Sequence, residues 1–157
     1  MIKDSGNRTE FESGAVRDIQ SGKGRCDLLP LDIAAQLFMD DPITSECLWR
    51  IGRFVETLDV THIRCALNSF VRNYYGTMAT ALLEVSIHYE EGALKYGEHN
   101  WEKGIPIHSY VDSAVRHLLK ICRGDDDEDH KRAFIWNLLG LMWTMKHKPE
   151  LNDIGGV

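Results

Sequence analysis

Residues 89–106, YEEGALKYGEHNWEKGIP, join the end of an amphipathic helix to a loop broken by glycines. On that helix Leu83, Ile87 and Leu94 share one face with Glu90, because all four fall at three-and-four spacing. Burying an unpaired carboxylate costs several kcal/mol, so such a position usually holds a metal, a cation or a partner. The pattern leaves a second interpretation open, in which the helix is rotated and Glu90 is half exposed.

The rest of this stretch indicates a functional surface. Residues 98–103 form a loop between two glycines. The large apolar side chain of Trp101 would be exposed to water there unless a contact orders the loop. On the helix, a second stripe is polar and is either a solvated face of ion pairs or one wall of a polar cleft. Its members are Glu84, His88, Glu91 and Lys95.

Composition bounds the classes of protein that fit. A chain of 157 residues that is 43% hydrophobic fits one domain, which we place at 11–148 between a mobile tail at 1–10 and a C-terminal tail at 149–157. A net charge of -6 argues against non-specific nucleic-acid binding. The four scattered cysteines, the lack of a signal peptide and the lack of a long apolar run predict a cytoplasmic protein with reduced thiols and no membrane partner.

A glycine-rich basic loop precedes the helical part of the sequence. Within residues 11–30, three glycines alternate with Arg17, Lys23 and Arg25, a combination that suits phosphate oxygens. The segment SGKGR is not a Walker A loop, because that motif needs GxxxxGK followed by Ser or Thr. A solvated basic loop is the other interpretation of this segment.

The remaining pattern predicts an all-α fold, a single-domain helical bundle. No convincing period-two alternation, βαβ signal or internal repeat is visible. Apolar periodicity, capping residues and breakers place helices at about 33–38, 45–57, 60–75, 77–96, 109–122 and 128–146. On the fifth helix, Asp112 and Arg116 are spaced to pair, and the apolar stripe contains Val111, Val115, Leu118 and Cys122.

An acidic run, GDDDED at residues 124–129, opens the last helix. A polar stripe follows on its apolar body, where His130 and Asn137 stand two turns apart and predict a lined cavity. Carboxylates in such numbers suit a hard divalent ion such as Mg²⁺ or Mn²⁺, whereas the cysteine spacing does not support thiolate zinc. A helical bundle with such ions can bind a nucleoside polyphosphate and activate water for attack on phosphorus.

Four blocks of the sequence carry a resemblance to a known family. They are GAVRDIQSGKGRCDLLP, YEEGALKYGEHNWEKGIP, SYVDSAVRHLLK and GDDDEDHKRAFIWNLL. Together they resemble the phage-type dATP/dGTP diphosphohydrolase N-terminal domain family, which is related in kind to the MazG-like all-α NTP pyrophosphatases. The blocks span residues 14–143 except for 40–80, a segment for which we identify no counterpart in the family.

The resemblance implies a metal-dependent hydrolase that cuts dGTP, with dATP as the other candidate, to the monophosphate and pyrophosphate. It implies a homodimer or homotetramer and a place in phage nucleotide metabolism such as 2-aminoadenine synthesis. It extends to Glu90, Lys95, Tyr96, Gly97, Asn100, Trp101, Lys103, Asp112, Arg116, His117, Asp126, Glu128, Asp129, His130 and Asn137. The metal motifs ExxE and ExxD of MazG-like enzymes do not appear cleanly, since Ile87 stands three residues after Glu84.

We therefore predict the following site. Glu90, Glu91, Asp126 and Asp129 are the catalytic and metal-binding residues, and they hold Mg²⁺ or Mn²⁺. Substrate contacts come from Arg17, Lys23, Arg25, Lys95, Asn100, Trp101, Lys103, Arg116, His117, His130 and Asn137, with Asn100, Trp101 and Asn137 facing the purine.

Two other classes compete with this prediction. The helices could form a non-catalytic oligomerisation or nucleotide-binding module, in which the acidic run serves solubility only. An HD-type triphosphohydrolase is disfavoured, because that class needs an adjacent His-Asp pair and the sequence contains none.

Overall fold

The computed structural model describes residues 2–155, and most of them are helical. In chain order the helices are α1 (Leu31–Gln36), α2 (Pro42–Thr57), α3 (Thr61–Tyr74), α4 (Met78–Tyr96), α5 (Ile107–Arg123) and α6 (His130–His147). Short 3-10 turns occur at η1 (Cys26–Leu28), η2 (Asn100–Lys103) and η3 (Pro149–Leu151). The predicted all-α bundle is confirmed, and all six expected helices are present with small shifts at their ends.

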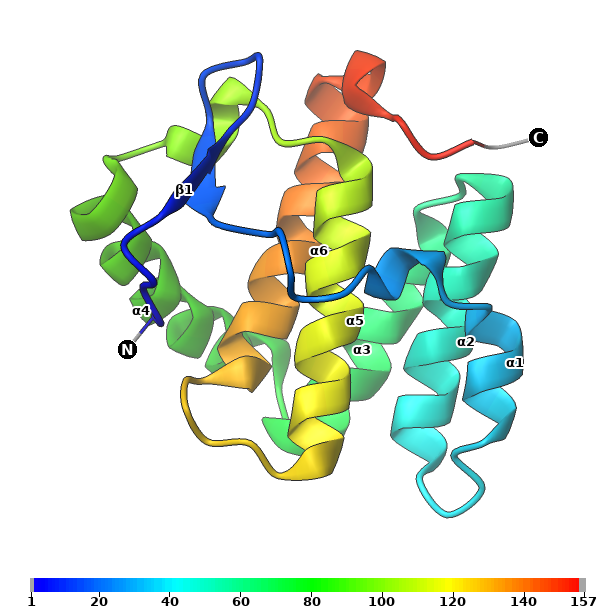
Figure 1. The fold of residues 1–157 in the computed structure, drawn as a ribbon. Helices are drawn as coiled ribbons and strands as arrows, with labels where there is room; N and C mark the ends of the chain where they lie inside the picture. The colour runs from blue at the N-terminus through cyan, green and yellow to red at the C-terminus, as the bar shows by residue number, and fades with distance from the viewer. Residues whose placement is uncertain (1, 156–157) are drawn as a thin grey trace.

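Helices α5 and α6 form the centre of the bundle. They lie side by side, with α1 to α3 on one side and α4 on the other (Figure 1). Val111, Val115 and Leu118 of α5 are fully buried. The two helices approach closely at Gly140, where an added Cβ would overlap the ring of Tyr110. A glycine inside α6 is therefore required by packing, although it lowers helix propensity.

Side-chain caps explain where three helices begin. Asp41 accepts a hydrogen bond from the Thr44 amide at the start of α2, and Thr77 accepts one from the Thr80 amide at the start of α4. Asp129 does the same for the amide of Arg132 in α6. Each cap satisfies an amide that has no partner within its helix, so these three residues determine where α2, α4 and α6 begin.

A short hairpin precedes the bundle. Strands β1 (Arg8–Glu10) and β2 (Val16–Asp18) pair antiparallel, with Thr9 opposite Arg17. Three-residue strands are too short to show a period-two pattern, so no sequence pattern predicts them. β1 lies within residues 1–10, for which we predicted a mobile tail; Met1 is outside the described residues.

The outer side of α4 differs from the prediction. Leu83 and Leu94 are 72% and 86% exposed, and Glu90 between them is exposed as well. The stripe exists, but it faces solvent in this chain, as in the second interpretation of Glu90. Cys122, expected on the core side of α5, is also exposed.

Candidate functional site

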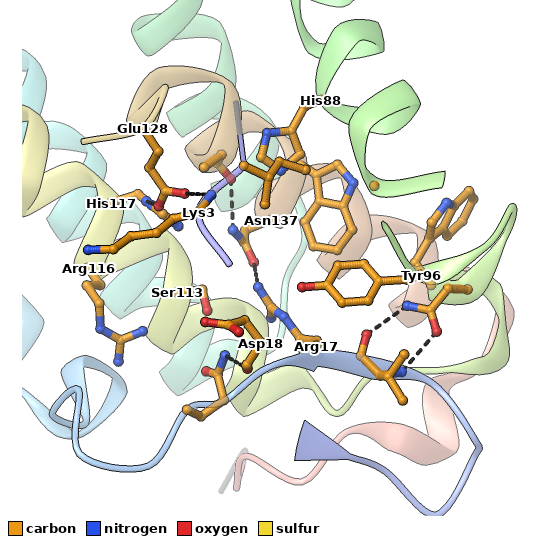
Figure 2. Close-up of a pocket in the computed structure, with 18 of the residues that line it drawn as sticks. Lys3, Arg17, Asp18, His88, Tyr96, Ser113, Arg116, His117, Glu128 and Asn137 are labelled. Carbon is orange, nitrogen blue, oxygen red and sulfur yellow. Dashed lines mark hydrogen bonds and ion pairs between the residues drawn. The ribbon is translucent and has the colours of Figure 1, made fainter. Parts of the chain in front are cut away.

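A cavity of about 610 Å³ lies between the N-terminal hairpin, α4, η2, α5 and α6. Figure 2 shows Glu128, His117 and Arg116 on one side of the view, Tyr96 on the other, and Arg17 with Asn137 between them. Its wall combines cationic side chains with aromatic rings. The cations are Lys3, Arg17, Lys23, Arg116, Lys120 and Arg123, and the aromatic residues include Tyr89, Tyr96, Trp101 and Trp136.

Two buried asparagines hold the hairpin against the bundle. Asn100 Oδ1 accepts a hydrogen bond from the Val16 amide at 2.9 Å, and its Nδ2 donates to the Val16 carbonyl at 2.8 Å. Asn137 Oδ1 accepts from the Arg17 guanidinium at 3.0 Å, while its Nδ2 donates to Ala133 O at 2.8 Å. The guanidinium also lies 5.4 Å from the ring centre of Trp136. Both amides therefore position the segment that carries Arg17.

The predicted pair on α5 holds the glycine-rich loop. Asp112 and Arg116 form an ion pair of 2.6 Å, as their spacing predicts. Asp112 Oδ1 also accepts from the Cys26 amide at 2.7 Å, and Arg116 donates to the Gly24 carbonyl at 2.7 Å. This buried pair fixes the loop that carries Lys23 and closes one side of the cavity.

A cluster of two histidines and a glutamate lies where α5 meets the start of α6. The Nδ1 atoms of His117 and His130 are 2.9 Å apart, and Glu128 Oε1 lies 3.5 Å and 3.7 Å from them. His117 and Glu128 line the cavity. On the far side of His130, Nε2 lies 2.7 Å from Asp127 Oδ1.

Burial keeps two of the histidines near the cavity neutral. Desolvation lowers the pKa of His117 well below its usual value, and the neighbouring His130 lowers it further. The pKa of His88 falls to about 4, again through burial, although Glu91 opposes the shift. At pH 7 both rings are therefore uncharged and have one nitrogen lone pair available for a ligand.

The four acids predicted as metal ligands do not converge in this chain. Glu90 and Asp126 are exposed, Glu91 is half-buried on α4, and Asp129 caps α6 and lies 3.3 Å from Arg132 Nε. Among residues 2–155, two groups of three metal-ligating side chains have their ligand atoms within 4.8 Å of one another. They are His117, Glu128 and His130, and Asp125, Asp127 and His130, so neither contains any of the four acids.

The predicted substrate contacts divide into two sets. Seven of them line the cavity, namely Arg17, Lys23, Asn100, Trp101, Arg116, His117 and Asn137. The other four do not line the cavity. Arg25 pairs with Asp27, Lys95 donates to the Lys3 carbonyl, and the carbonyl of Lys103 accepts from Lys148. His130 is buried behind His117.

Sequence reasoning missed several residues of the wall. Lys3 lies in the segment predicted as a tail, and its backbone amide donates to Glu128 Oε2 at 3.0 Å. Lys120 lines the cavity one turn after Arg116 and has no ion-pair partner within residues 2–155. Its three-and-four spacing from Arg116 and His117 was a usable signal. Nothing in the pattern indicated Lys3, because its position depends on the hairpin.

The protein is all-α, and its cavity combines cationic side chains with aromatic rings. This combination is typical of a site for an anionic ligand that carries a ring. A family model described as dATP/dGTP diphosphohydrolase, N-terminal, matches residues 60–154, more than half of the chain. The chain belongs to this family, whose description indicates a nucleotide hydrolase with a deoxynucleoside triphosphate substrate. No curated protein and no solved structure matches the chain.

The matched interval runs from the end of the α2–α3 connection to just beyond η3. It contains three of the four blocks that carry the resemblance, and it starts after the glycine-rich segment. It also includes residues 60–80, so the expectation that all of 40–80 has no counterpart in the family is wrong for that part. None of the helices described is long and apolar enough to cross a membrane. The four cysteines are free thiols, as expected.

Proposed function

We propose that the chain is a metal-dependent pyrophosphohydrolase that converts dGTP, or dATP, to the monophosphate and pyrophosphate in the cavity between the hairpin and the bundle. The observation that carries the proposal is the wall of this cavity, in which cations and aromatic rings face one space of about 610 Å³. Such a volume is typical of sites for ligands of nucleotide size. The family description supports the substrate class.

Cationic side chains would neutralise the triphosphate. Arg17 is fixed by Asn137 and by the carbonyl of Ser109 at 3.4 Å, so its guanidinium is oriented before substrate enters. Among the described residues Lys120 forms no ion pair, whereas Lys3 and Lys23 of the wall pair with Asp127 and Asp18, so Lys120 is the wall lysine most available to phosphate oxygens. Preoriented cations stabilise charge on a leaving pyrophosphate at little reorganisation cost.

The aromatic part of the wall would bind the purine. Tyr96 and Trp101 line the cavity from the end of α4 and from η2. Trp101 is braced by Trp143, with ring centres 5.0 Å apart at 87°. A braced indole offers a π-face to a base with little loss of side-chain entropy. Asn100 and Asn137, predicted to face the purine, contribute here by holding the hairpin.

A divalent ion, Mg²⁺ or Mn²⁺, is part of this proposal. When bound, such an ion polarises phosphate oxygens and lowers the pKa of a coordinated water. Glu90, Glu91, Asp126 and Asp129 do not fit one common ion within a single chain, because no three of them belong to a convergent group among the described residues. Of the two donor sets that converge among residues 2–155, the one that includes Glu128 borders the cavity.

A nucleotide panel tests the proposal. The protein is incubated with dGTP, dATP and the ribonucleotides in Mg²⁺ or Mn²⁺, and products are separated as pyrophosphate, triphosphate or orthophosphate. We expect equimolar dGMP and pyrophosphate from dGTP, and no product in excess EDTA. Triphosphate release would instead indicate a triphosphohydrolase. Binding of dGTP without any product would favour the nucleotide-binding module.

Association of copies belongs to the same proposal, as a homodimer or homotetramer. Its support in this chain is the exposed apolar side of α4, which includes Leu82, Leu83 and Leu94. Apolar patches of this kind often mark protein interfaces. We also propose a role in supplying a phage nucleotide pathway such as 2-aminoadenine synthesis, which product analysis in infected cells would test.

A further inference from the structure

Three ligand atoms converge on one point of the cavity wall, although they come from two separate segments. His117 projects from the middle of α5, whereas Glu128 and His130 lie at the start of α6. Nδ1 of each histidine and Oε1 of Glu128 all lie within 4.8 Å of one another. The side chains of His130 and Glu128 are only 2% and 12% exposed. Burying three such polar groups together is costly unless something satisfies them.

The hydrogen bonds around the cluster fix which atoms face inward. Asp127 Oδ1 lies 2.7 Å from His130 Nε2 and accepts a hydrogen bond from it, which favours the tautomer of His130 with its proton on Nε2. In that tautomer the unprotonated Nδ1 of His130 lies 2.9 Å from His117 Nδ1. A single proton on His117 Nδ1 satisfies this contact. If that proton moves to Nε2 of the same ring, both Nδ1 lone pairs become available to a cation.

Outer contacts also orient the glutamate. The Lys3 amide donates to Glu128 Oε2 at 3.0 Å, which leaves Oε1 directed at the two histidines. A carboxylate on the outer nitrogen of a ligating histidine, and a hydrogen bond on the outer oxygen of a ligating carboxylate, are the usual supports of protein metal sites. This arrangement has both (Figure 2 shows Glu128 bridging Lys3 and His117).

The separations suit a metal ion. Two ligands at about 2.0–2.2 Å from one ion are roughly 2.9–3.5 Å apart for bond angles between octahedral and tetrahedral values. The measured separations are 2.9, 3.5 and 3.7 Å, so movements of a few tenths of an ångström would complete the set. His117 and Glu128 border the cavity, so further coordination positions face the space where phosphates would lie.

We propose that His117, Glu128 and His130 form a divalent-metal site with two nitrogen ligands and one oxygen ligand, open toward the cavity. Imidazole ligands favour Mn²⁺, Co²⁺ or Zn²⁺ over Mg²⁺, because affinity at a nitrogen-bearing site rises along the divalent series. Asp127 and the Lys3 amide position the ligands and do not bind the ion. The ion's contact with a substrate phosphate rests on the proposed function, whereas its binding to the protein does not.

Metal binding to the full chain without nucleotide tests the site. Co²⁺ binding is followed by its visible absorption and by calorimetry, Mn²⁺ binding by loss of the free-ion EPR signal, and Mg²⁺ by calorimetry. We expect one Co²⁺ or Mn²⁺ per chain and much weaker Mg²⁺ binding. His117→Gln and Glu128→Gln should each lower Co²⁺ affinity by about 100-fold or more, and Asp127→Asn by about 10-fold.

Matched substitutions elsewhere control for non-specific effects. His147→Gln and Glu150→Gln make the same chemical changes at exposed positions near the other end of α6 and should leave Co²⁺ affinity unchanged. Melting curves without metal show whether each variant folds. Glu128→Gln keeps an acceptor for the Lys3 amide, so its fold should survive even if a histidine variant does not.

The results separate this proposal from the proposed function. Absence of Co²⁺ and Mn²⁺ binding to the wild-type chain, or wild-type affinity in folded Glu128→Gln, would overturn the metal site. Loss of metal binding in these variants, together with no hydrolysis by the wild type, would leave the site standing and overturn the hydrolase. Stronger binding of Mg²⁺ than of Co²⁺ would contradict the nitrogen ligands.

Discussion

The outer face of α4 and the core face of α5 have the same apolar spacing and opposite surroundings. On α5, Val111, Val115 and Leu118 are fully buried against the rest of the bundle. On α4, Leu83 and Leu94 are largely exposed. The three-and-four pattern identifies a helix and its apolar stripe, but it does not say whether the partner of that stripe belongs to the same chain.

A similar contrast separates two carboxylates, Glu90 on α4 and Glu128 just before α6. The sequence predicts a functional role for Glu90 because it interrupts an apolar stripe, yet its side chain is exposed. Glu128 lies in an ordinary acidic run, yet its side chain is 12% exposed and contacts two histidines. Burial inside the chain, and not sequence context alone, separates the two, so they make a direct experimental comparison.

The largest effect is expected at these carboxylates. Glu128→Gln should reduce kcat/KM for dGTP by about 100-fold or more, because it removes a charged ligand at the cavity wall. Glu90→Gln should cause a smaller loss, because Glu90 is exposed and does not line the cavity in this chain. Both are measured by pyrophosphate release at saturating Mg²⁺ and Mn²⁺.

The activity of either variant can contradict the role proposed for its carboxylate. Full turnover by Glu90→Gln with dGTP and Mg²⁺ would remove Glu90 from the metal site that the sequence predicts. A greater loss at Glu90 than at Glu128 would show that the outer face of α4 completes the active site through a second copy. That result would reverse the comparison between the two surfaces.

The next effect concerns packing on the two sides of the molecule. Gly140→Ala places a methyl group against the ring of Tyr110 between α5 and α6, and should destabilise the fold by about 1–3 kcal/mol. Gly92→Ala is the matched change in α4, where no neighbouring atom lies within 4 Å of the added Cβ. It should stabilise the fold by about 0.5–1 kcal/mol through helix propensity. Urea unfolding measures both, and equal effects would contradict the packing at Gly140.

Much of the fold could be predicted because local signals agree. Apolar periodicity places all six helices, and Gly124 ends α5 as the sequence indicates. The hairpin could not be predicted, because its order comes from distant contacts. Asn100, 84 residues from Val16 in sequence, makes two of the hydrogen bonds that hold it.

The sequence predicted pairs of site residues that lie on one helix, but not the contacts between residues of different helices. Spacing on single helices identified the Asp112–Arg116 pair and the polar stripe with His130 and Asn137. The meeting of His117 with Glu128 requires the crossing of α5 and α6, which no local pattern encodes. Carboxylate-rich runs suit Mg²⁺ and therefore predict metal ligands, but an acidic residue at a helix start also serves capping, as Asp129 does.

A smaller effect tests how the hairpin closes the cavity. Asn100→Ala leaves the amide and carbonyl of Val16 without their partners and should cost about 1–2 kcal/mol. Loss of these bonds should also speed hydrogen exchange of residues 8–18 more than that of α5. Asn73→Ala, at an exposed position on α3, is the matched control and should change neither quantity. Unchanged exchange in the hairpin would show that Asn100 is not its main attachment.

The smallest effect on folding, and the sharpest test of the outer face, comes from Leu94→Asp. Leu94 is 86% exposed, so the free energy of unfolding of a single chain should change by no more than about 0.5 kcal/mol. If copies associate through this side of α4, a charge there opposes burial, and the mass in solution measured by light scattering should fall to that of one chain. Leu37→Asp makes the same change at a position on the opposite side of the bundle that is 77% exposed, and should leave the mass unchanged. An assembly that survives Leu94→Asp would place the interface elsewhere, and the apolar stripe of α4 would then lack a partner in the homo-oligomer as it does in the single chain.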